Sequence, residues 1–166
     1  MDDLSFQKAT DSDLDAVLDI YNFYIETTTA TFDCGPVSKE EFLGRNIMDH
    51  EKYRVYLITQ ENILAGFYFL TQFRKKKAYD RTAEAGIYLK PEYTGRGIGK
   101  ESVAFLEEEA RKRGIKVLIA SISNENTASI KLVREMGYEK CAHYKQVGEK
   151  FGRVLDVVEF QKILTG

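Results

Sequence analysis

The sequence has 166 residues, a formal net charge of −2, 43% hydrophobic residues and 30% charged residues, a composition typical of globular proteins. The slight acidic excess argues against nucleic acid as a partner, because proteins that bind it usually carry a basic excess. No apolar run reaches the length of a membrane span. Two histidines and two distant cysteines provide neither a metal-ligand spacing nor a disulfide framework.

The N-terminal segment, Met1-Asp2-Asp3-Leu4-Ser5, is acidic and lacks the basic and apolar regions of a signal peptide. We therefore expect a cytoplasmic protein with no membrane partner. No repeat, low-complexity segment or linker divides the chain, and its length suits one domain over residues 1–166.

The predicted elements begin with a short apolar segment, followed by an amphipathic helix from Leu14 to Ile25. The sequence Ser38-Lys39-Glu40-Glu41 is a capping-box pattern, which predicts a second helix carrying apolar residues as far as Met48. The remaining predictions are strands at 53–59, 63–72 and 82–89, a helix at 99–113, a strand at 117–123, a helix at 127–136 and strands at 138–146 and 155–162. The order βααβββαβαββ indicates an α/β (α+β) fold with a mixed sheet.

Three glycines, Gly95, Gly97 and Gly99, alternate with other residues between the strand at 82–89 and the helix at 99–113. Glycine allows positive φ and a close backbone approach, and such a turn at a helix N-terminus is suited to binding phosphate. A Walker loop is excluded because Glu101 follows the Gly-Lys pair, and neither register of a Rossmann fingerprint finds its third glycine. A plain strand-to-helix turn is the alternative.

The segment Thr94-Gly95-Arg96-Gly97-Ile98-Gly99 resembles the acetyl-CoA loop of the GNAT acetyltransferase superfamily, with Thr94 at a position where Gln or Arg is usual. Four further blocks, in chain order, resemble the phosphinothricin N-acetyltransferase branch. They are 21–26 with 31–32, 78–84, 122–129 and 148–156. The resemblance implies a GNAT-like mixed, mostly antiparallel sheet flanked by helices. It also implies acetyl-CoA as co-substrate, no metal, a small-molecule amine substrate and a homodimer.

Glu84 is the candidate general base. It lies in an otherwise apolar strand, and alternation puts it on one face with Thr82, Gly86 and Tyr88. From the pattern alone, this carboxylate lies either on a solvated face or in a functional site. The resemblance favours the base, which would remove a proton from an α-amino group whose ordinary pKa is near ~8.

The resemblance also assigns cofactor-binding residues. The backbone of the strand before the glycine turn would bind the pantetheine arm as an added strand, and the turn would bind the phosphates. The predicted residues are Ile87, Tyr88, Leu89, Gly95, Arg96, Gly97, Ile98, Gly99, Lys100 and Asn126. Taken alone, Asn126 is equally an ordinary turn residue before a helix, and Arg96 and Lys100 are equally surface charges.

The polar loop Arg74-Lys75-Lys76-Lys77 would ordinarily be read as solvated. By resemblance, Arg74, Lys76 and Tyr79 hold the acidic end of an amino-acid-like substrate, and Phe32 forms an aromatic wall of the same pocket. Phe32 could equally be a core residue.

Besides Thr94, three positions depart from the resembled pattern. Val133 stands where relatives carry His or Tyr, which leaves open the group that protonates the CoA thiolate; Val154 replaces a Trp and Glu149 an apolar residue, which leaves the exact substrate open. We expect an acetyl-CoA-dependent N-acetyltransferase that acts by direct transfer on the α-amino group of a small amino acid or analogue, such as phosphinothricin or methionine sulfoximine or sulfone. The alternatives are an acyl-CoA sensor without turnover and an acetyltransferase for a peptide or protein N-terminus.

Overall fold

The computed structural model describes residues 3–165; Met1 and Asp2 of the acidic start, and Gly166, lie outside the described residues. The order of strands and α-helices is the predicted βααβββαβαββ, with single 3₁₀ turns at Asp11–Asp13, Lys77–Tyr79 and Pro91–Tyr93. The elements are β1 (Leu4–Lys8), α1 (Leu14–Thr27), α2 (Lys39–Leu43), β2 (Arg54–Gln60), β3 (Ile63–Gln72), β4 (Thr82–Leu89), α3 (Ile98–Lys112), β5 (Val117–Ser123), α4 (Thr127–Glu135), β6 (Glu139–Lys150) and β7 (Arg153–Ile163).

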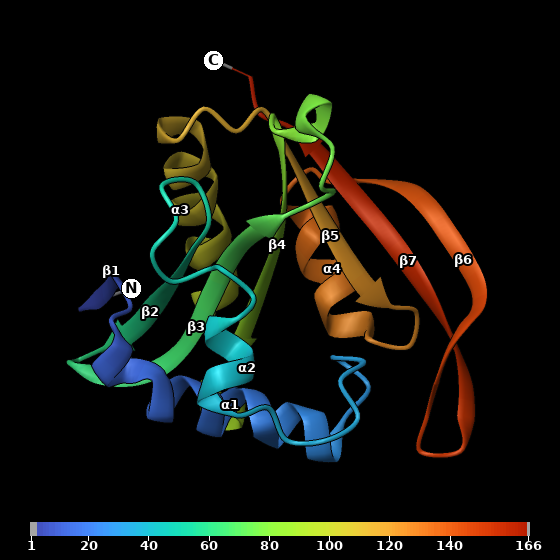
Figure 1. The fold of residues 1–166 in the computed structure, drawn as a ribbon, viewed down its shortest axis with the longest axis horizontal. Coiled ribbons are helices and arrows are strands. Elements are labelled where there is room, and N and C mark those ends of the chain that lie inside the picture. Colours follow the sequence, from blue (N-terminus) through green and yellow to red (C-terminus); the bar gives the residue numbers. More distant parts are fainter. Residues whose placement is uncertain (1–2, 166) are drawn as a thin grey trace.

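Within residues 3–165 the strands form one seven-stranded sheet in the order β1-β2-β3-β4-β5-β7-β6, with α1 and α2 on one face and α3 and α4 on the other (Figure 1). Adjacent residues of β3 show the two faces. Phe67 packs against Tyr21 of α1 with ring centroids 6.3 Å apart, whereas Tyr68 packs against Phe105 of α3 at 6.4 Å. This alternation buries both sides of the central strands.

The sheet is antiparallel except where β4 meets β5, which confirms the expected mixed, mostly antiparallel architecture. In the described chain this parallel pairing covers only three residue pairs, from Thr82–Val117 to Glu84–Ile119. β4 continues to Leu89 in register with β3. The two strands therefore diverge after Glu84 (Figure 1), and the far part of β4 has an open edge.

The second helix is shorter than the capping pattern predicts. Ser38 caps α2 as expected, its Oγ accepting from the Glu41 amide at 3.2 Å, but the helix ends at Leu43 instead of continuing to Met48. Asn46 has a φ of 57°, a left-handed conformation that a helix cannot contain. Met48 is nevertheless buried, so this apolar residue packs in the core without being part of a helix.

The β6–β7 hairpin is longer than predicted, because β6 continues to Lys150 rather than ending at Gln146. Its pairing with β7 shifts between Lys140 and Ala142 and again between Tyr144 and Gly148. Bulges of this kind break the two-residue alternation from which strands are recognised in a sequence. Figure 1 shows the hairpin reaching beyond the rest of the sheet.

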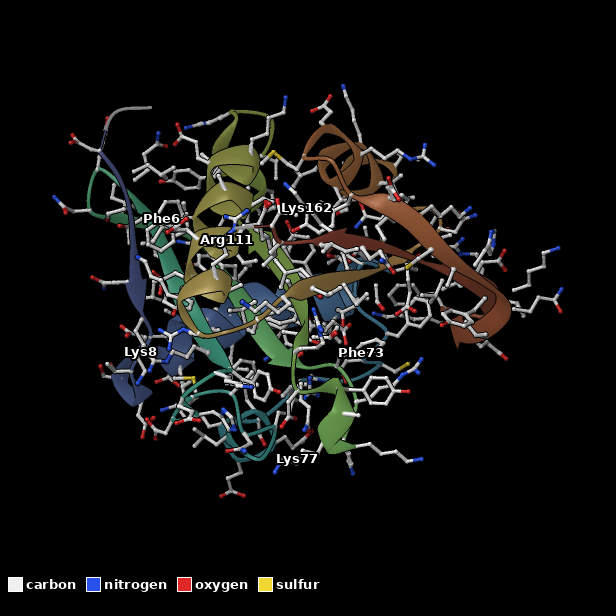
Figure 2. All side chains as sticks on the ribbon, turned by 90° about the horizontal axis from the view of Figure 1, so that it is seen from above. Phe6, Lys8, Phe73, Lys77, Arg111 and Lys162 are labelled. Atoms are coloured by element: carbon white, nitrogen blue, oxygen red, sulfur yellow. The ribbon has the colours of Figure 1, made fainter. Side chains whose placement is uncertain are left out.

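An ion pair between a partly exposed lysine of β7 and a buried glutamate of α3 joins these two elements. Glu107 is only 3% exposed, and Lys162 Nζ lies 2.5 Å from its Oε1 and 2.8 Å from the Met136 carbonyl oxygen. Figure 2 shows Lys162 on the α3 side of the molecule. One lysine thus satisfies both a buried carboxylate and a carbonyl near the end of α4.

Lys162→Met should destabilise the protein by about 3 kcal/mol, because it leaves the buried Glu107 carboxylate without its cation. Urea unfolding at neutral pH measures this loss. Lys116→Met is the matched control, because Lys116 is exposed and should change stability by less than about 0.5 kcal/mol. Equal midpoints for the two variants would mean that the pair contributes nothing.

Candidate functional site

Glu84 lies where β4 and β5 begin to diverge, opposite Ile119. Burial raises the pKa of Glu84, the nearby Glu159 carboxylate raises it further, and a hydrogen bond with Ser121 offsets part of the rise. A carboxyl group with a raised pKa is a better proton acceptor near neutral pH than an ordinary glutamate. The site therefore contains a candidate general base with a physical reason for its basicity.

The backbone N–H and C=O groups of β4 point alternately toward its two neighbouring strands, β3 and β5. The Lys90 amide donates to the Ala65 carbonyl of β3 at 2.8 Å, and the Arg81 carbonyl accepts from the Lys116 amide, just before β5, at 2.7 Å. In an extended strand the backbone groups of successive residues point to opposite edges. Even-numbered residues of β4 therefore direct these groups toward β3, and odd-numbered residues direct them toward β5.

Past Glu84 this alternation aims the backbone groups of Ile87 and Leu89 into the gap that β5 leaves. The Leu89 carbonyl accepts a hydrogen bond from the Tyr24 hydroxyl. Tyr88, the third predicted pantetheine-binding residue, turns its backbone toward β3, and its ring packs against Tyr21 at 5.2 Å. The register thus favours Ile87 and Leu89 over Tyr88 for an extended ligand arm.

The glycine turn has the conformation that its composition predicts. Gly95 has a φ of 71° and Gly97, the N-cap of α3, a φ of 83°. Nothing lies within 4 Å of the position where a Cβ of Gly95 would stand, so a ligand can approach the backbone there. A Cβ on Gly99 would lie 3.1 Å from Leu132 of α4. Gly99 therefore permits close packing of two helices, and the buried Ile98 anchors the turn.

The two cations of the turn already have neighbours. The Arg96 guanidinium lies 5.2 Å from the centre of the Tyr93 ring. Lys100 Nζ lies 2.9 Å from Glu135 Oε2 of α4, and both side chains are partly exposed. A phosphate ligand would therefore compete with Glu135 for Lys100, whereas Arg96 carries no carboxylate partner within the described residues.

Asn126 is the N-cap of α4. Its Oδ1 accepts from the Ser129 amide at 3.3 Å, the capping role that its position before a helix suggests. Its side-chain amide nitrogen is not used in this bond. The cofactor role of Asn126 stays a prediction.

The connection between β3 and β4 brings Arg74 and Tyr79 together. Arg74 Nη1 donates to the Tyr79 hydroxyl at 3.4 Å, and its guanidinium lies 4.6 Å from the centre of the Phe73 ring, which Figure 2 shows in this connection. The Lys76 side chain makes no hydrogen bond or ion pair in the described part of the chain, and its backbone carbonyl accepts from the Tyr79 amide at 2.9 Å. Two of the three predicted anion-binding residues thus form one cluster.

Phe32 packs against β6. A Cβ on Gly148 would lie only 2.3 Å from the Phe32 ring, so the glycine provides the space for this side chain. Lys150, at the end of the same strand, donates to the Thr31 carbonyl oxygen at 2.7 Å and is 4% exposed. Burial lowers the pKa of the Lys150 ammonium group.

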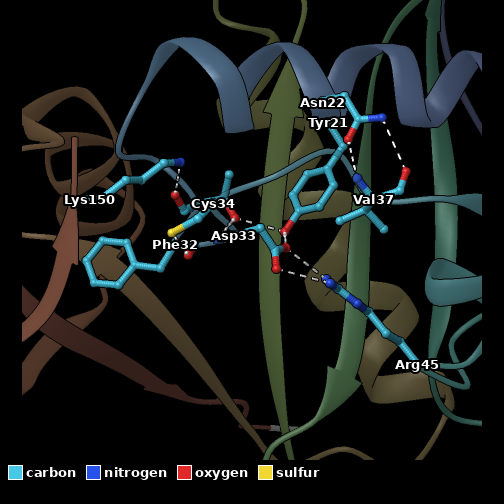
Figure 3. A network of polar contacts seen from close by, with 9 residues as sticks. Tyr21, Asn22, Phe32, Asp33, Cys34, Val37, Arg45 and Lys150 are labelled. Carbon is cyan, nitrogen blue, oxygen red and sulfur yellow. Dashed lines mark hydrogen bonds and ion pairs between the residues drawn. The ribbon is translucent and has the colours of Figure 1, made fainter.

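A polar network fixes the loop that carries Phe32 (Figure 3). The Tyr21 hydroxyl donates to Asp33, and Arg45 binds both Asp33 oxygens at 3.1 and 3.2 Å. Asn22 accepts from the Val37 amide at 2.9 Å and donates to its carbonyl. Burial raises the pKa of Asp33, but its hydrogen bonds from Arg45 and Tyr21 outweigh burial and hold the pKa below its ordinary value.

The same loop is also tied to the opposite side of the site. Glu125, in the β5–α4 turn, accepts a hydrogen bond from Thr29 and two bonds of 2.9 Å from Arg153 of β7. Hydrogen bonds from Arg153 and Thr29 lower the pKa of Glu125 to about 2. The loop is therefore anchored at both ends, which positions Phe32 before any ligand arrives.

Three polar residues near Glu84 were not singled out from the sequence. Ser121 of β5 donates to Glu159 Oε2 of β7 at 2.5 Å, and Tyr144 of β6 donates to Glu159 Oε1 at 2.8 Å. Glu159 interrupts an apolar run in the sequence as Glu84 does, so the same signal could have identified it. Only the strand order reveals that the two carboxylates are neighbours.

Within residues 3–165 no three His, Cys, Asp or Glu side chains are placed to hold a metal ion. None of the helices described is both long and apolar enough to cross a membrane. The predicted roles of the site residues are not tested by these observations and stay predictions.

Comparison with known proteins gives consistent matches. The family described as acetyltransferase (GNAT) domain matches residues 6–158. A curated L-methionine sulfoximine/L-methionine sulfone acetyltransferase of Salmonella typhimurium is 29% identical over 163 residues, covering 95% of this chain and 93% of that protein.

Two solved structures illustrate the structural similarity. A GNAT superfamily phosphinothricin acetyltransferase from Sinorhizobium meliloti, in complex with AcCoA, is 30% identical with a TM-score of 0.91, covering 98% of this chain and 89% of that one. A ribosomal-protein-alanine N-acetyltransferase from Brucella melitensis is 38% identical with a TM-score of 0.88, covering 96% and 99%. The similarity thus extends over nearly the whole length of each protein.

Glu84→Gln should stabilise the protein at pH 7.5. Because the folded-state pKa of Glu84 is raised, ionisation costs the folded state stability once the pH rises above the ordinary carboxyl value. Thermal unfolding should show a higher Tm for the variant at pH 7.5, with the gain shrinking toward pH 4. The exposed Glu61→Gln should show no such gain, and a lower Tm for Glu84→Gln at pH 7.5 would contradict the burial argument.

Proposed function

The chain belongs to the family of GNAT acetyltransferase domains, and from that premise we propose that it acetylates the α-amino group of a small amino acid or analogue, with acetyl-CoA as donor. Phosphinothricin and methionine sulfoximine or sulfone are the proposed substrate type, because relatives across nearly the full length carry these names. Residues 1–166 would form one N-acetyltransferase domain. The observation that carries the proposal is the placement of Glu84 at the point where β4 and β5 diverge.

Two features of the chain support acetyl-CoA as the donor: an open strand edge and a glycine turn at a helix N-terminus. Ile87 and Leu89 offer backbone groups along an open strand edge, to which an extended amide-containing arm can add as a further strand. The turn at Gly95 and Gly97 has positive φ and leads into the N-terminus of α3, which is suited to binding pyrophosphate. When bound, acetyl-CoA supplies an acetyl group activated as a thioester.

The acceptor amine must lose a proton before it can attack, because an ammonium group has no lone pair. Glu84 would take this proton, directly or through one water molecule, and the amine would then receive the acetyl group in a direct transfer. Val133 is buried in α4 and has no proton to donate. The thiolate would therefore be protonated by another group or by water.

The acceptor side chain would extend toward the β3–β4 connection. Arg74 and Tyr79 form a cluster there, and Arg74 lies close enough to Tyr144 and Glu159 to interact electrostatically with both. Together with Lys76 it would bind the acidic end of the substrate, while Phe32 would form an aromatic wall. A zwitterionic acceptor suits a site with carboxylates at one end and a guanidinium at the other.

We also propose a cytoplasmic homodimer. The tip of the β6–β7 hairpin exposes Val147, Phe151 and Val154, each more than half accessible, and exposed apolar side chains of this kind mark interaction surfaces. Sedimentation equilibrium would decide between a monomer and a dimer.

Glu84→Gln should reduce kcat by roughly 100-fold, the scale of a lost general base. The Kd for acetyl-CoA should change by less than about twofold, because the substitution removes a proton acceptor and no proposed donor contact. Steady-state kinetics and calorimetric titration measure the two quantities. Equal losses in turnover and in acetyl-CoA affinity would contradict the assignment of Glu84 as base.

Arg74→Ala should raise KM for an anionic amino-acid acceptor by about tenfold or more, since a charge-assisted hydrogen bond contributes roughly 1.5–3 kcal/mol. The KM for acetyl-CoA should not change. Lys75→Ala is the matched control, because Lys75 is exposed in the same connection and carries no proposed role. A common effect of both substitutions would indicate general electrostatic attraction instead of a specific contact.

A panel of amines tests the function as a whole by following release of the CoA thiol. Turnover with phosphinothricin or methionine sulfone, but not with spermidine or a peptide, supports the proposal. Turnover only with a peptide bearing an N-terminal alanine would favour the alternative suggested by the Brucella melitensis protein's description. Acetyl-CoA binding without turnover on any amine would favour a sensor.

A further inference from the structure

Glu159 is a second carboxylate beside the proposed base, and the sheet register places it there. Ser121 of β5 pairs with Glu159 of β7, while Ile119, two residues earlier on the same face, pairs with Glu84 of β4. Cross-strand and diagonal neighbours on one face are within reach of each other's side chains. Ser121 therefore lies two residues beyond the last β4–β5 pair, on the sheet face that carries both carboxylates.

The contacts agree with this placement. Ser121 Oγ donates to Glu159 Oε2 at 2.5 Å, and the same hydroxyl lies near enough to Glu84 to lower the pKa of its carboxyl group. A hydroxyl has one proton to donate but two lone pairs. Ser121 donates its proton to Glu159 in this arrangement, and when it donates to the ionised Glu84 instead, it lowers the pKa of that carboxyl group. Ser121 accepts from Glu84 only when Glu84 carries a proton.

We propose that Glu159 is a positioning residue that acts through Ser121 and receives the proton which Glu84 removes from the acceptor amine. This inference rests on the proposed acetyl transfer. The acceptor ammonium gives one proton to the Glu84 carboxylate. Glu84 passes that proton to Ser121 Oγ as the hydroxyl proton of Ser121 moves to Glu159. Glu84 becomes ionised again, Ser121 is unchanged, and Glu159 releases the proton to water from its partly exposed position.

The other titratable groups around Glu84 and Glu159 keep one charge state from acid to neutral pH. Arg74, from the β3–β4 connection, remains a cation. Burial raises the pKa of Cys141, which lies beside Glu159, and hydrogen bonding to Glu159 raises that of Tyr144; burial also raises the pKa of Tyr88 on β4. The thiol and both phenols are therefore neutral at acid and neutral pH.

The tests are Glu159→Gln, which retains size and hydrogen bonding but removes the charge, and Ser121→Ala, which breaks the link but retains both carboxylates. Glu159→Gln should move the acid limb of the kcat/KM profile to lower pH, because Glu84 loses a like-charged neighbour. Each variant should lower kcat at least fivefold, and the double variant should be no slower than either single one. The KM for acetyl-CoA should stay unchanged.

Two results would overturn the proposal: an acid limb that stays in place in Glu159→Gln, or effects of the two substitutions that multiply in the double variant. Glu61→Gln, in the distant β2–β3 turn, is the matched control and should leave both the profile and kcat unchanged. Carbon-13 NMR titration of the Glu84 carboxyl group in the free enzyme separates this proposal from the proposed function. A pKa of Glu84 that falls in Glu159→Gln supports the pairing even if no amine is turned over, and an unchanged value contradicts it.

Discussion

β4 and β5 make only a short parallel contact, and the layout of the candidate site follows from it. Because the two strands pair only from Thr82 to Glu84 on the β4 side, the remainder of β4 keeps an open edge inside a sheet that is otherwise paired. The backbone of Ile87 and Leu89 faces that edge, and the chain then enters the turn at Gly95 and Gly97. The proposed donor site thus combines a strand edge with a helix N-terminus.

The loop that carries Phe32 is held in place mostly by polar contacts. Asp33 binds Arg45 and Tyr21, and Lys150 donates to a carbonyl of the same loop from the end of β6. Each of these groups loses hydration on burial, and each regains a charge-assisted hydrogen bond. Such contacts depend on geometry more than apolar packing does, so they define one loop conformation and thus one position for the aromatic ring.

Charge is divided across the proposed acceptor site. Glu84 and Glu159 lie near the point where β4 and β5 separate, whereas Arg74 lies at the β3–β4 connection, close enough to Glu159 to interact with it. A purely anionic acceptor would meet repulsion from the carboxylates, and a polyamine would meet repulsion from Arg74. An acceptor with an ammonium group at one end and an acidic group at the other finds a partner for each.

The element order, the glycine turn and the isolated glutamate of β4 can all be predicted from the sequence. Apolar periodicity, alternating glycines and a charge in an apolar strand are local signals. The sequence predicted too long a second helix and too short a β6, since the left-handed Asn46 and the bulges near Gln146 follow from packing. The proximity of Glu84, Ser121 and Glu159 and the space that Gly148 leaves for Phe32 are visible only in the folded structure. These residues come from separate strands and loops, and a local pattern carries no information about which strands become neighbours.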